Sequence, residues 1–200
     1  MSHPPTTSPH LRGVIFDMDG TLTEPVIDFA GMRRRLGIPT GDILATVRAW
    51  PEAQRRTAFD VIEEIEEDAR LRMTIRPGTV ELLAFLDRSG IRRGLITRNT
   101  TRAVDCLVKR LGTDFSEVVT REFDPVKPDP ASALHVSRKW GIAPSEIMLL
   151  GDYRDDLLCG NAAGMRTCLL KTDRNHEFAA LAHYVVDDLK QFRALVARLA

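Results

Sequence analysis

The chain has 200 residues, a hydrophobic content of 44% and a formal net charge of zero. A chain of this length can bury a hydrophobic core, and we expect one main domain with a modest insert. Because positive and negative charges balance, we expect no global electrostatic attraction to nucleic acid or to an anionic membrane, and neither is predicted as a partner.

The cysteines and the N-terminal residues bear on the cellular setting. Cys106, Cys159 and Cys168 are odd in number and show no CxxC spacing, so the sequence predicts neither a disulfide framework nor a zinc site. A reduced, cytoplasmic location is the simpler interpretation. Residues 1–10 are rich in Pro, Ser and Thr and lack the apolar segment of a signal peptide, which predicts a disordered leader. No stretch reaches the length of a membrane span, so we expect a soluble protein.

The first predicted strand ends in a pair of carboxylates. Asp17 and Asp19 follow its apolar run, and because residues i and i+2 of an extended segment point to the same side, the two acids can act together. Gly20 permits a sharp turn at the strand end, where open α/β sheets bind their ligands. One acid can then attack a substrate while the other transfers protons. An EF-hand calcium loop is disfavoured, because its fifth position is Thr21 and its twelfth, which should be Glu, is Asp28.

Residues 24–74 form the longest interval between two predicted strands and carry a helical pattern. Apolar residues recur there at intervals of three and four: Phe59, Ile62, Ile65, Ala69 and Met73. Such an insert cannot belong to the sheet, and we expect a small helical lid of about three helices. For the basic run at residues 33–35 we favour a solvated helix face over recognition of a substrate phosphate. Arg48 and Trp50 are better candidates for a substrate-facing loop.

Six strands are predicted in all, at residues 13–16, 92–96, 117–120, 147–150, 166–170 and 184–186. Helical patterns separate most of them, which is typical of a doubly wound parallel α/β sheet with right-handed crossovers. Three further polar segments each follow a predicted strand: Thr97-Arg98-Asn99, the proline-rich loop around Lys127, and Gly151-Asp152-Tyr153-Arg154-Asp155-Asp156.

In this order of motifs the sequence resembles the haloacid dehalogenase (HAD) superfamily. The segment DMDGT at residues 17–21 matches the first motif of that family, Thr97 the second, Lys127 the third and GDYRDD at residues 151–156 the fourth. The resemblance extends over nearly the whole chain from Leu11, and four ordered motifs are far more specific than any single one.

The resemblance implies a fold and a domain organisation. The core would be an HAD-like, Rossmann-type doubly wound parallel sheet formed by residues 11–23 and 75–200. Residues 24–74 would be a helical cap inserted after the first strand, as in phosphoglycolate phosphatase-like enzymes. In such enzymes the cap closes over the site and selects the substrate.

The resemblance further implies a phosphatase that acts on a small phosphorylated metabolite with Mg²⁺ as cofactor. Asp17, the main-chain carbonyl of Asp19 and Asp152 would hold the metal, which prefers hard oxygen ligands. Asp17 would attack phosphorus and form an aspartyl phosphate, while Asp19 would protonate the leaving oxygen and later activate water. Lys127 would supply a fixed positive charge. Asp156 would orient Lys127 or a metal-bound water without binding the metal itself.

Phosphate binding is assigned to Thr97, Arg98, Asn99 and Gly20. Asn99 either contacts the phosphate or caps the helix expected to begin near Thr101.

Several alternatives bear on the activity and the assembly. The acid at position 19 argues against a dehalogenase, which has no alkoxide leaving group to protonate, and against a phosphonatase, which lacks this carboxylate. A phosphomutase of the β-phosphoglucomutase type would share these core residues, although a short cap weakens that alternative. A non-catalytic HAD-fold binding protein would be expected to have lost them. The sequence does not predict the oligomeric state.

Overall fold

The computed structural model describes residues 10–200, so all of the predicted leader except its last residue lies outside the described part. The chain divides into two compact units, one formed by the described part of Met1–Glu24 together with Ile75–Ala200, and the other by Pro25–Thr74. Glu24, which the predicted insert included, lies in the first unit. Its carboxylate is 3.4 Å from the guanidinium of Arg76, which follows the insert in sequence.

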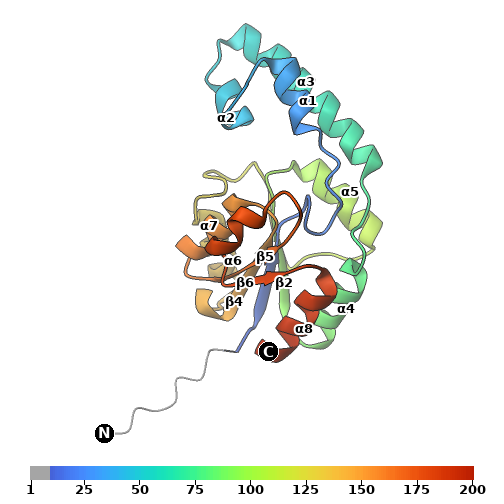
Figure 1. Ribbon diagram of the computed structural model, residues 1–200, viewed down its shortest axis with the longest axis vertical. Helices are drawn as coiled ribbons and strands as arrows, with labels where there is room; N and C mark the ends of the chain where they lie inside the picture. Colours follow the sequence, from blue (N-terminus) through green and yellow to red (C-terminus); the bar gives the residue numbers. More distant parts are fainter. Residues whose placement is uncertain (1–9) are drawn as a thin grey trace, which may run out of the picture. The chain divides into compact units, whose positions relative to one another are not determined.

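The first unit is built on a six-stranded parallel sheet in the order β3-β2-β1-β4-β5-β6 (Figure 1). The strands are β1 (Gly13–Phe16), β2 (Arg92–Ile96), β3 (Glu117–Val119), β4 (Ile147–Gly151), β5 (Arg166–Leu170) and β6 (Tyr184–Val186). The predicted doubly wound parallel sheet is therefore confirmed. The third strand ends one residue earlier than predicted, and the fourth continues to Gly151. Strand order reverses at β1, which creates the crevice beyond the strand ends where open α/β sheets bind ligands.

Helices cover both faces of this sheet, as Figure 1 shows. On one face α6 (Ala131–Trp140) packs against β2 and β3, and α7 (Arg154–Ala162) packs against β4 and β5. On the other face α4 (Thr79–Arg88) packs against β2 and α8 (Leu189–Leu199) against β6. Helix α5 (Thr101–Leu111) connects β2 to β3.

Strand β1 supplies side chains to both faces because successive strand residues alternate in direction. Ile15 belongs to the apolar cluster that contains α6 residues, whereas the ring of Phe16 meets Phe192 of α8 edge-on. All four residues of β1 are buried. A strand buried on both faces reads as a continuous apolar run, which is why this one was legible in the sequence.

The second unit consists of three helices, α1 (Phe29–Leu36), α2 (Ile43–Arg48) and α3 (Glu52–Arg72). They enclose a small core of their own, formed by Met32, Ile38, Ile43, Val47, Ala58 and Ile62. Trp50 packs against this core, whereas Arg48 is exposed. The basic run is largely engaged within the unit, because Arg35 pairs with Glu64 of α3 at 2.6 Å and Arg33 donates to the carbonyl of Gly41 at 2.6 Å. This pairing supports the interpretation of a helix surface.

The two segments that flank the insert are joined to each other within the first unit. Thr23 and Ile75 form an antiparallel bridge, and the amide of Arg76 donates to the carbonyl of Leu22 at 2.9 Å. The Arg76 guanidinium also donates to the carbonyl of Gly20 at 2.9 Å. The chain therefore leaves and re-enters the core next to the turn that follows β1.

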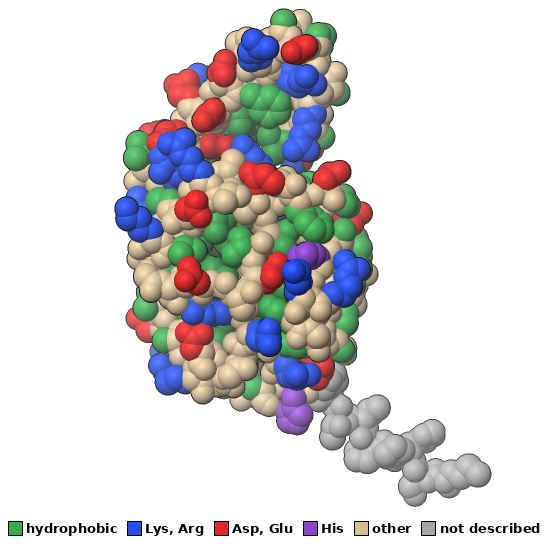
Figure 2. All heavy atoms as spheres, turned by 180° about the vertical axis from the view of Figure 1, so that it is seen from behind, with side chains coloured by type: hydrophobic (Ala, Val, Ile, Leu, Met, Phe, Trp, Pro, Cys, Tyr) green, Lys and Arg blue, Asp and Glu red, His purple; other side chains and the backbone are tan. Residues whose placement is uncertain are grey.

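The surface carries charges of both signs. Lysines and arginines are interspersed with acidic residues over the face shown in Figure 2. Among residues 10–200, no helix combines the length and the apolar character needed to cross a membrane.

Candidate active site

The turn after β1 brings the first acidic motif beside the fourth. The amide of Asp17 donates to the carbonyl of Leu150 at 2.9 Å, which ties the end of β1 to β4. Gly20 has φ +81°, a conformation that favours glycine. A Cβ atom at Gly20 would lie 2.3 Å from Oδ2 of Asp152. Only a residue without a side chain therefore allows the loop after β1 to approach Asp152 this closely.

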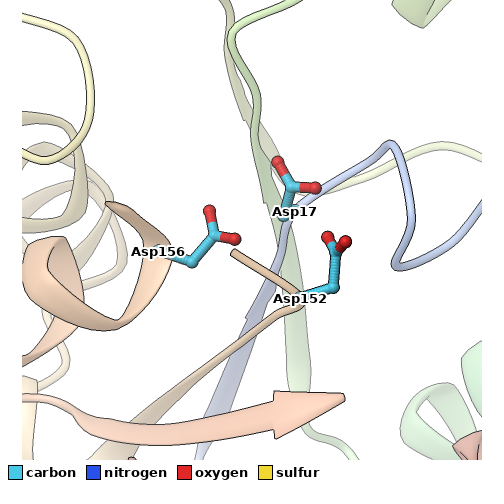
Figure 3. A group of neighbouring side chains, drawn as sticks. All are labelled: Asp17, Asp152 and Asp156. Carbon is cyan, nitrogen blue, oxygen red and sulfur yellow. The ribbon is translucent and has the colours of Figure 1, made fainter. Parts of the chain in front are cut away.

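Three carboxylates converge at this point (Figure 3). Asp17 lies at the end of β1, Asp152 after β4 and Asp156 in the first turn of α7, and one oxygen from each lies within 4.8 Å of the others. Burial raises the pKa of Asp17 well above its usual range, and the charges of Asp156 and Asp152 add to this effect while Lys127 opposes it. Burial and the neighbouring Asp156 raise the pKa of Asp152 to about 7. This crowding of negative charge favours a bound cation.

The donor set fits a hard divalent cation. Carboxylate oxygens are the ligands that Mg²⁺, Ca²⁺ and Mn²⁺ prefer, and no thiol or imidazole belongs to this group of acids. Asp156 joins the group by position, although the sequence assigned it a role outside the metal ligands. The side chain of Asp19 is not a member of the group, so its predicted part as a metal ligand rests on its main-chain carbonyl.

Lys127 balances two of the three carboxylates. Its side chain is buried, and Nζ donates to Oδ1 of Asp17 at 2.6 Å, to Oδ1 of Asp156 at 2.5 Å and to the carbonyl of Ile96 at 2.8 Å. Burial alone would lower the pKa of Lys127, but Asp156 and Asp17 outweigh it and the pKa is raised. The ammonium group therefore remains charged, with all three of its donors used.

Asp156 is held in the first turn of α7, which begins at Arg154. Its Oδ2 accepts from the amide of Tyr153 at 3.0 Å, and its Oδ1 accepts from Lys127. A carboxylate in the first turn of a helix is also stabilised by the helix dipole. A Cβ atom at Gly151 would lie 2.3 Å from Oδ2 of Asp156, so β4 must end in glycine for this carboxylate to reach Lys127.

The residues of the polar segment after β2 make different contacts. Thr97 is buried and its hydroxyl accepts from the amide of Asn99 at 3.1 Å. Arg98 lies 3.4 Å from the carboxylate of Asp155. The cap of α5 is Thr100, whose hydroxyl accepts from the amide of Ala103 at 3.3 Å, so the alternative in which Asn99 caps this helix is wrong. The amide group of Asn99 instead contacts the carboxylate of Asp19.

One buried residue near the site was missed by the sequence analysis. Asn175 donates from Nδ2 to the carbonyl of Asp152 at 2.7 Å and to that of Leu170 at 3.0 Å, and its Oδ1 accepts from the amide of Thr172 at 2.7 Å. It thereby ties the segment after β5 to the backbone of Asp152. Only its position shortly after a predicted strand could have drawn attention to it.

This geometry defines a doubly wound α/β protein with a carboxylate and lysine centre at the carboxyl ends of its central strands. A family model described as haloacid dehalogenase-like hydrolase matches residues 11–164. The chain belongs to this family and is a hydrolase. The predicted resemblance is therefore confirmed.

Individual relatives agree with this membership. A haloacid dehalogenase-like hydrolase domain-containing protein of Arabidopsis thaliana is 44% identical over 173 residues, which cover 80% of this chain and 71% of that protein. Phosphoglycolate phosphatase 1 of Pseudomonas aeruginosa is 31% identical over 194 residues, which cover 82% of this chain and 71% of that protein. Among solved structures, a hydrolase from Pseudomonas syringae shares the fold, with a TM-score of 0.78, 22% identity and coverage of 94% of this chain and 99% of that one.

Proposed function

We propose that this protein is a Mg²⁺-dependent phosphatase that hydrolyses small phosphate monoesters through an aspartyl phosphate on Asp17. The observation that carries the proposal is the contact of Asp17 with Lys127 at 2.6 Å beside the carboxylates of Asp152 and Asp156. A phosphate monoester is doubly charged at neutral pH, so a carboxylate nucleophile needs cations around it. This centre offers one fixed cation and a set of oxygen ligands for another.

The chemistry divides into two half-reactions. The free oxygen of Asp17 attacks phosphorus, the bond from phosphorus to the ester oxygen breaks, and Asp19 gives its proton to the departing alkoxide. Asp19 then takes a proton from water, which attacks the aspartyl phosphate and releases inorganic phosphate and the Asp17 carboxylate. Mg²⁺, held by Asp17, Asp152 and the main-chain carbonyl of Asp19, would offset charge on the phosphoryl oxygens.

The remaining residues would bind and orient the phosphate. Lys127 places a positive charge that does not move during the reaction, because three acceptors hold it. Asp156 would orient Lys127, which it contacts at 2.5 Å. Thr97, Arg98 and the backbone at Gly20 would face the phosphoryl oxygens. The unit Pro25–Thr74 would act as the cap that selects the organic part of a small phosphorylated metabolite.

A panel of phosphorylated metabolites tests the proposal. We expect phosphate release with Mg²⁺, loss of release after EDTA treatment and recovery when Mg²⁺ is restored. Ca²⁺ should inhibit, because it accepts more ligands and can take both oxygens of Asp17, which removes the attacking lone pair. Full hydrolysis in EDTA, or equal rates with Ca²⁺ and Mg²⁺, would contradict the metal role. Absence of phosphate release across the panel and from aryl phosphates would contradict the proposed function.

A further inference from the structure

The carboxylate of Asp19 lies between two polar side chains from different parts of the chain. Nδ2 of Asn99 donates to its Oδ2, and the hydroxyl of Thr23 lies 3.3 Å from its Oδ1. The same hydroxyl lies 3.2 Å from the carbonyl of Met18. Both oxygens of Asp19 therefore have defined partners before any substrate arrives.

Asn99 is placed by its own backbone and not by Asp19. Its amide donates to the hydroxyl of Thr97 at 3.1 Å, and its carbonyl accepts from the amide of Arg121 at 3.0 Å. Asn99 as a residue is 8% exposed, and its Nδ2 also lies 3.6 Å from the sulfur of Met18. The loop after β2 thus presents a rigid donor to an acid on the loop after β1.

We propose that Asn99 is a positioning residue for Asp19, and that it orients the general acid instead of binding the transferring phosphate. This inference rests on the proposed phosphatase function. An amide NH₂ group can only donate, so Asn99 keeps Oδ2 as an acceptor and leaves Oδ1 to carry the transferable proton. The Thr23 hydroxyl suits this arrangement, since it has one hydrogen and can give it either to Oδ1 or to the carbonyl of Met18.

The consequence is a dependence on the leaving group that a phosphate ligand would not produce. A misplaced general acid slows departure of a poor leaving group, whereas a good leaving group departs without a proton. Loss of a phosphate ligand slows all esters alike, because every ester carries the same phosphoryl group. The two possible roles of Asn99 therefore predict different effects of its substitution on the slope of log kcat/KM against the pKa of the leaving group.

The experiment compares wild type, Asn99→Ala and Asp19→Ala on aryl phosphates that range from dinitrophenyl phosphate to unsubstituted phenyl phosphate, with Mg²⁺ present. Because kcat/KM reports the steps up to release of the phenol, it isolates the first half-reaction. We expect Asn99→Ala to lose about 10- to 100-fold on phenyl phosphate and much less on dinitrophenyl phosphate, a part of the full general-acid contribution. In the Asp19→Ala background the same substitution should have little further effect.

Matched variants separate this role from a structural one. Asn161→Ala removes another asparagine of the core unit, one that donates to the carbonyl of Leu181 at 2.7 Å, and should leave the slope unchanged. Asn99→Ser, which keeps a donor, should recover part of the slope. The inference would be overturned if Asn99→Ala lost activity equally on all esters. It would also be overturned if Asn99→Ala left the slope unchanged while Asp19→Ala steepened it. Neither result would contradict the phosphatase function. A wild-type protein that hydrolyses none of these esters would instead overturn the proposed function.

Discussion

Lys127 is a buried cation that contacts two carboxylates, those of Asp17 and Asp156. Removal of its ammonium group would leave the carboxylates of Asp17 and Asp156 buried without their partner. We expect Lys127→Met to lower the free energy of unfolding by about 3 kcal/mol, the range found when one member of a buried pair is removed. Urea unfolding measures this. Lys171→Met is the matched control, because Lys171 pairs with Asp187 at 2.7 Å on the surface, and its loss should lower the free energy of unfolding much less. Equal costs would contradict the account.

We expect Asp17 to be essential for turnover. Because asparagine has the same shape as aspartate, we expect Asp17→Asn to keep the fold. Asp17→Asn would remove the proposed nucleophile and one negative charge from the cluster of three carboxylates. Turnover of an aryl phosphate should fall on the order of 10⁴-fold or more, as for other covalent nucleophiles. Activity and thermal unfolding should be measured on the same preparation. A folded variant with wild-type turnover would exclude Asp17 as the nucleophile.

The proposed role of Asp19 predicts that its substitution slows hydrolysis of some esters more than others, depending on the leaving group. Asp19→Ala should reduce hydrolysis of an alkyl phosphate far more than that of an activated aryl phosphate, within the range of about 10²- to 10⁴-fold that general acid catalysis contributes. Some loss on both is expected, because the proposed mechanism also requires Asp19 to assist water in the second half-reaction. Comparison of kcat/KM for the two esters measures this. If phosphorylation of Asp17 slowed equally for both, Asp19 would serve the metal site or the fold.

At the level of elements, the site depends on how closely two loops approach. The loop after β1 and the loop after β4 meet at Gly20 and Asp152, and the arrangement leaves no room for a Cβ atom. In the same second loop, Gly151 leaves room for the carboxylate of Asp156, and Asn175 donates to the carbonyl of Asp152. The glycines at these strand ends therefore set the spacing of the acidic groups.

Substitution of Gly20 tests this spacing. Gly20→Ala should weaken Mg²⁺ binding markedly, because the new Cβ atom would displace the carboxylate of Asp152, and calorimetric titration of the apo-protein measures the affinity. Gly112→Ala is the matched control: Gly112 has φ +64°, and nothing lies within 4 Å of the position that its new methyl group would take. Both variants carry the backbone cost of a left-handed residue, roughly 1–2 kcal/mol. Equal Mg²⁺ affinity in the two variants would show that the close approach is unimportant.

At the level of the whole molecule, the acidic centre should couple stability to pH. The pKa of Asp152 is raised to about 7 in the folded protein, while in the unfolded chain it is near 4, roughly the ordinary value for Asp. Between these values the folded state binds more protons than the unfolded state, so stability without metal should fall as pH rises through this window. Mg²⁺ requires the ionised form, and its stabilisation should grow over the same window.

Melting temperatures with EDTA and with Mg²⁺, measured between about pH 5 and about pH 8, check this coupling. Asp152→Asn cannot ionise at this position, so it should show a flatter profile in EDTA and a smaller gain from Mg²⁺. An identical pH profile for wild type and Asp152→Asn would contradict the assignment of the raised pKa to this carboxylate.

The sequence by itself determined the strands and the motif residues, because the signals for them are local. An apolar run such as Val14, Ile15 and Phe16 can be recognised as a strand in the sequence, because a strand buried on both faces consists almost entirely of apolar residues. The polar residues that follow the central strands indicated where a site would form, since parallel strands end at one edge. The spacings of three and four in residues 59–73 predicted a helical insert, and these residues lie in or directly after α3.

Only the tertiary structure decided which of these residues contact each other. Lys127 meets Asp156 as well as Asp17, and Asn99 meets Asp19 instead of capping α5. Asn175 donates to the carbonyl of Asp152, although it belongs to none of the motifs identified in the sequence. Such contacts join loops that are distant in sequence, and the register of the sheet and the bends of its loops determine them. Residue types and local spacing do not specify either, so these partners emerge only when the strands are assembled.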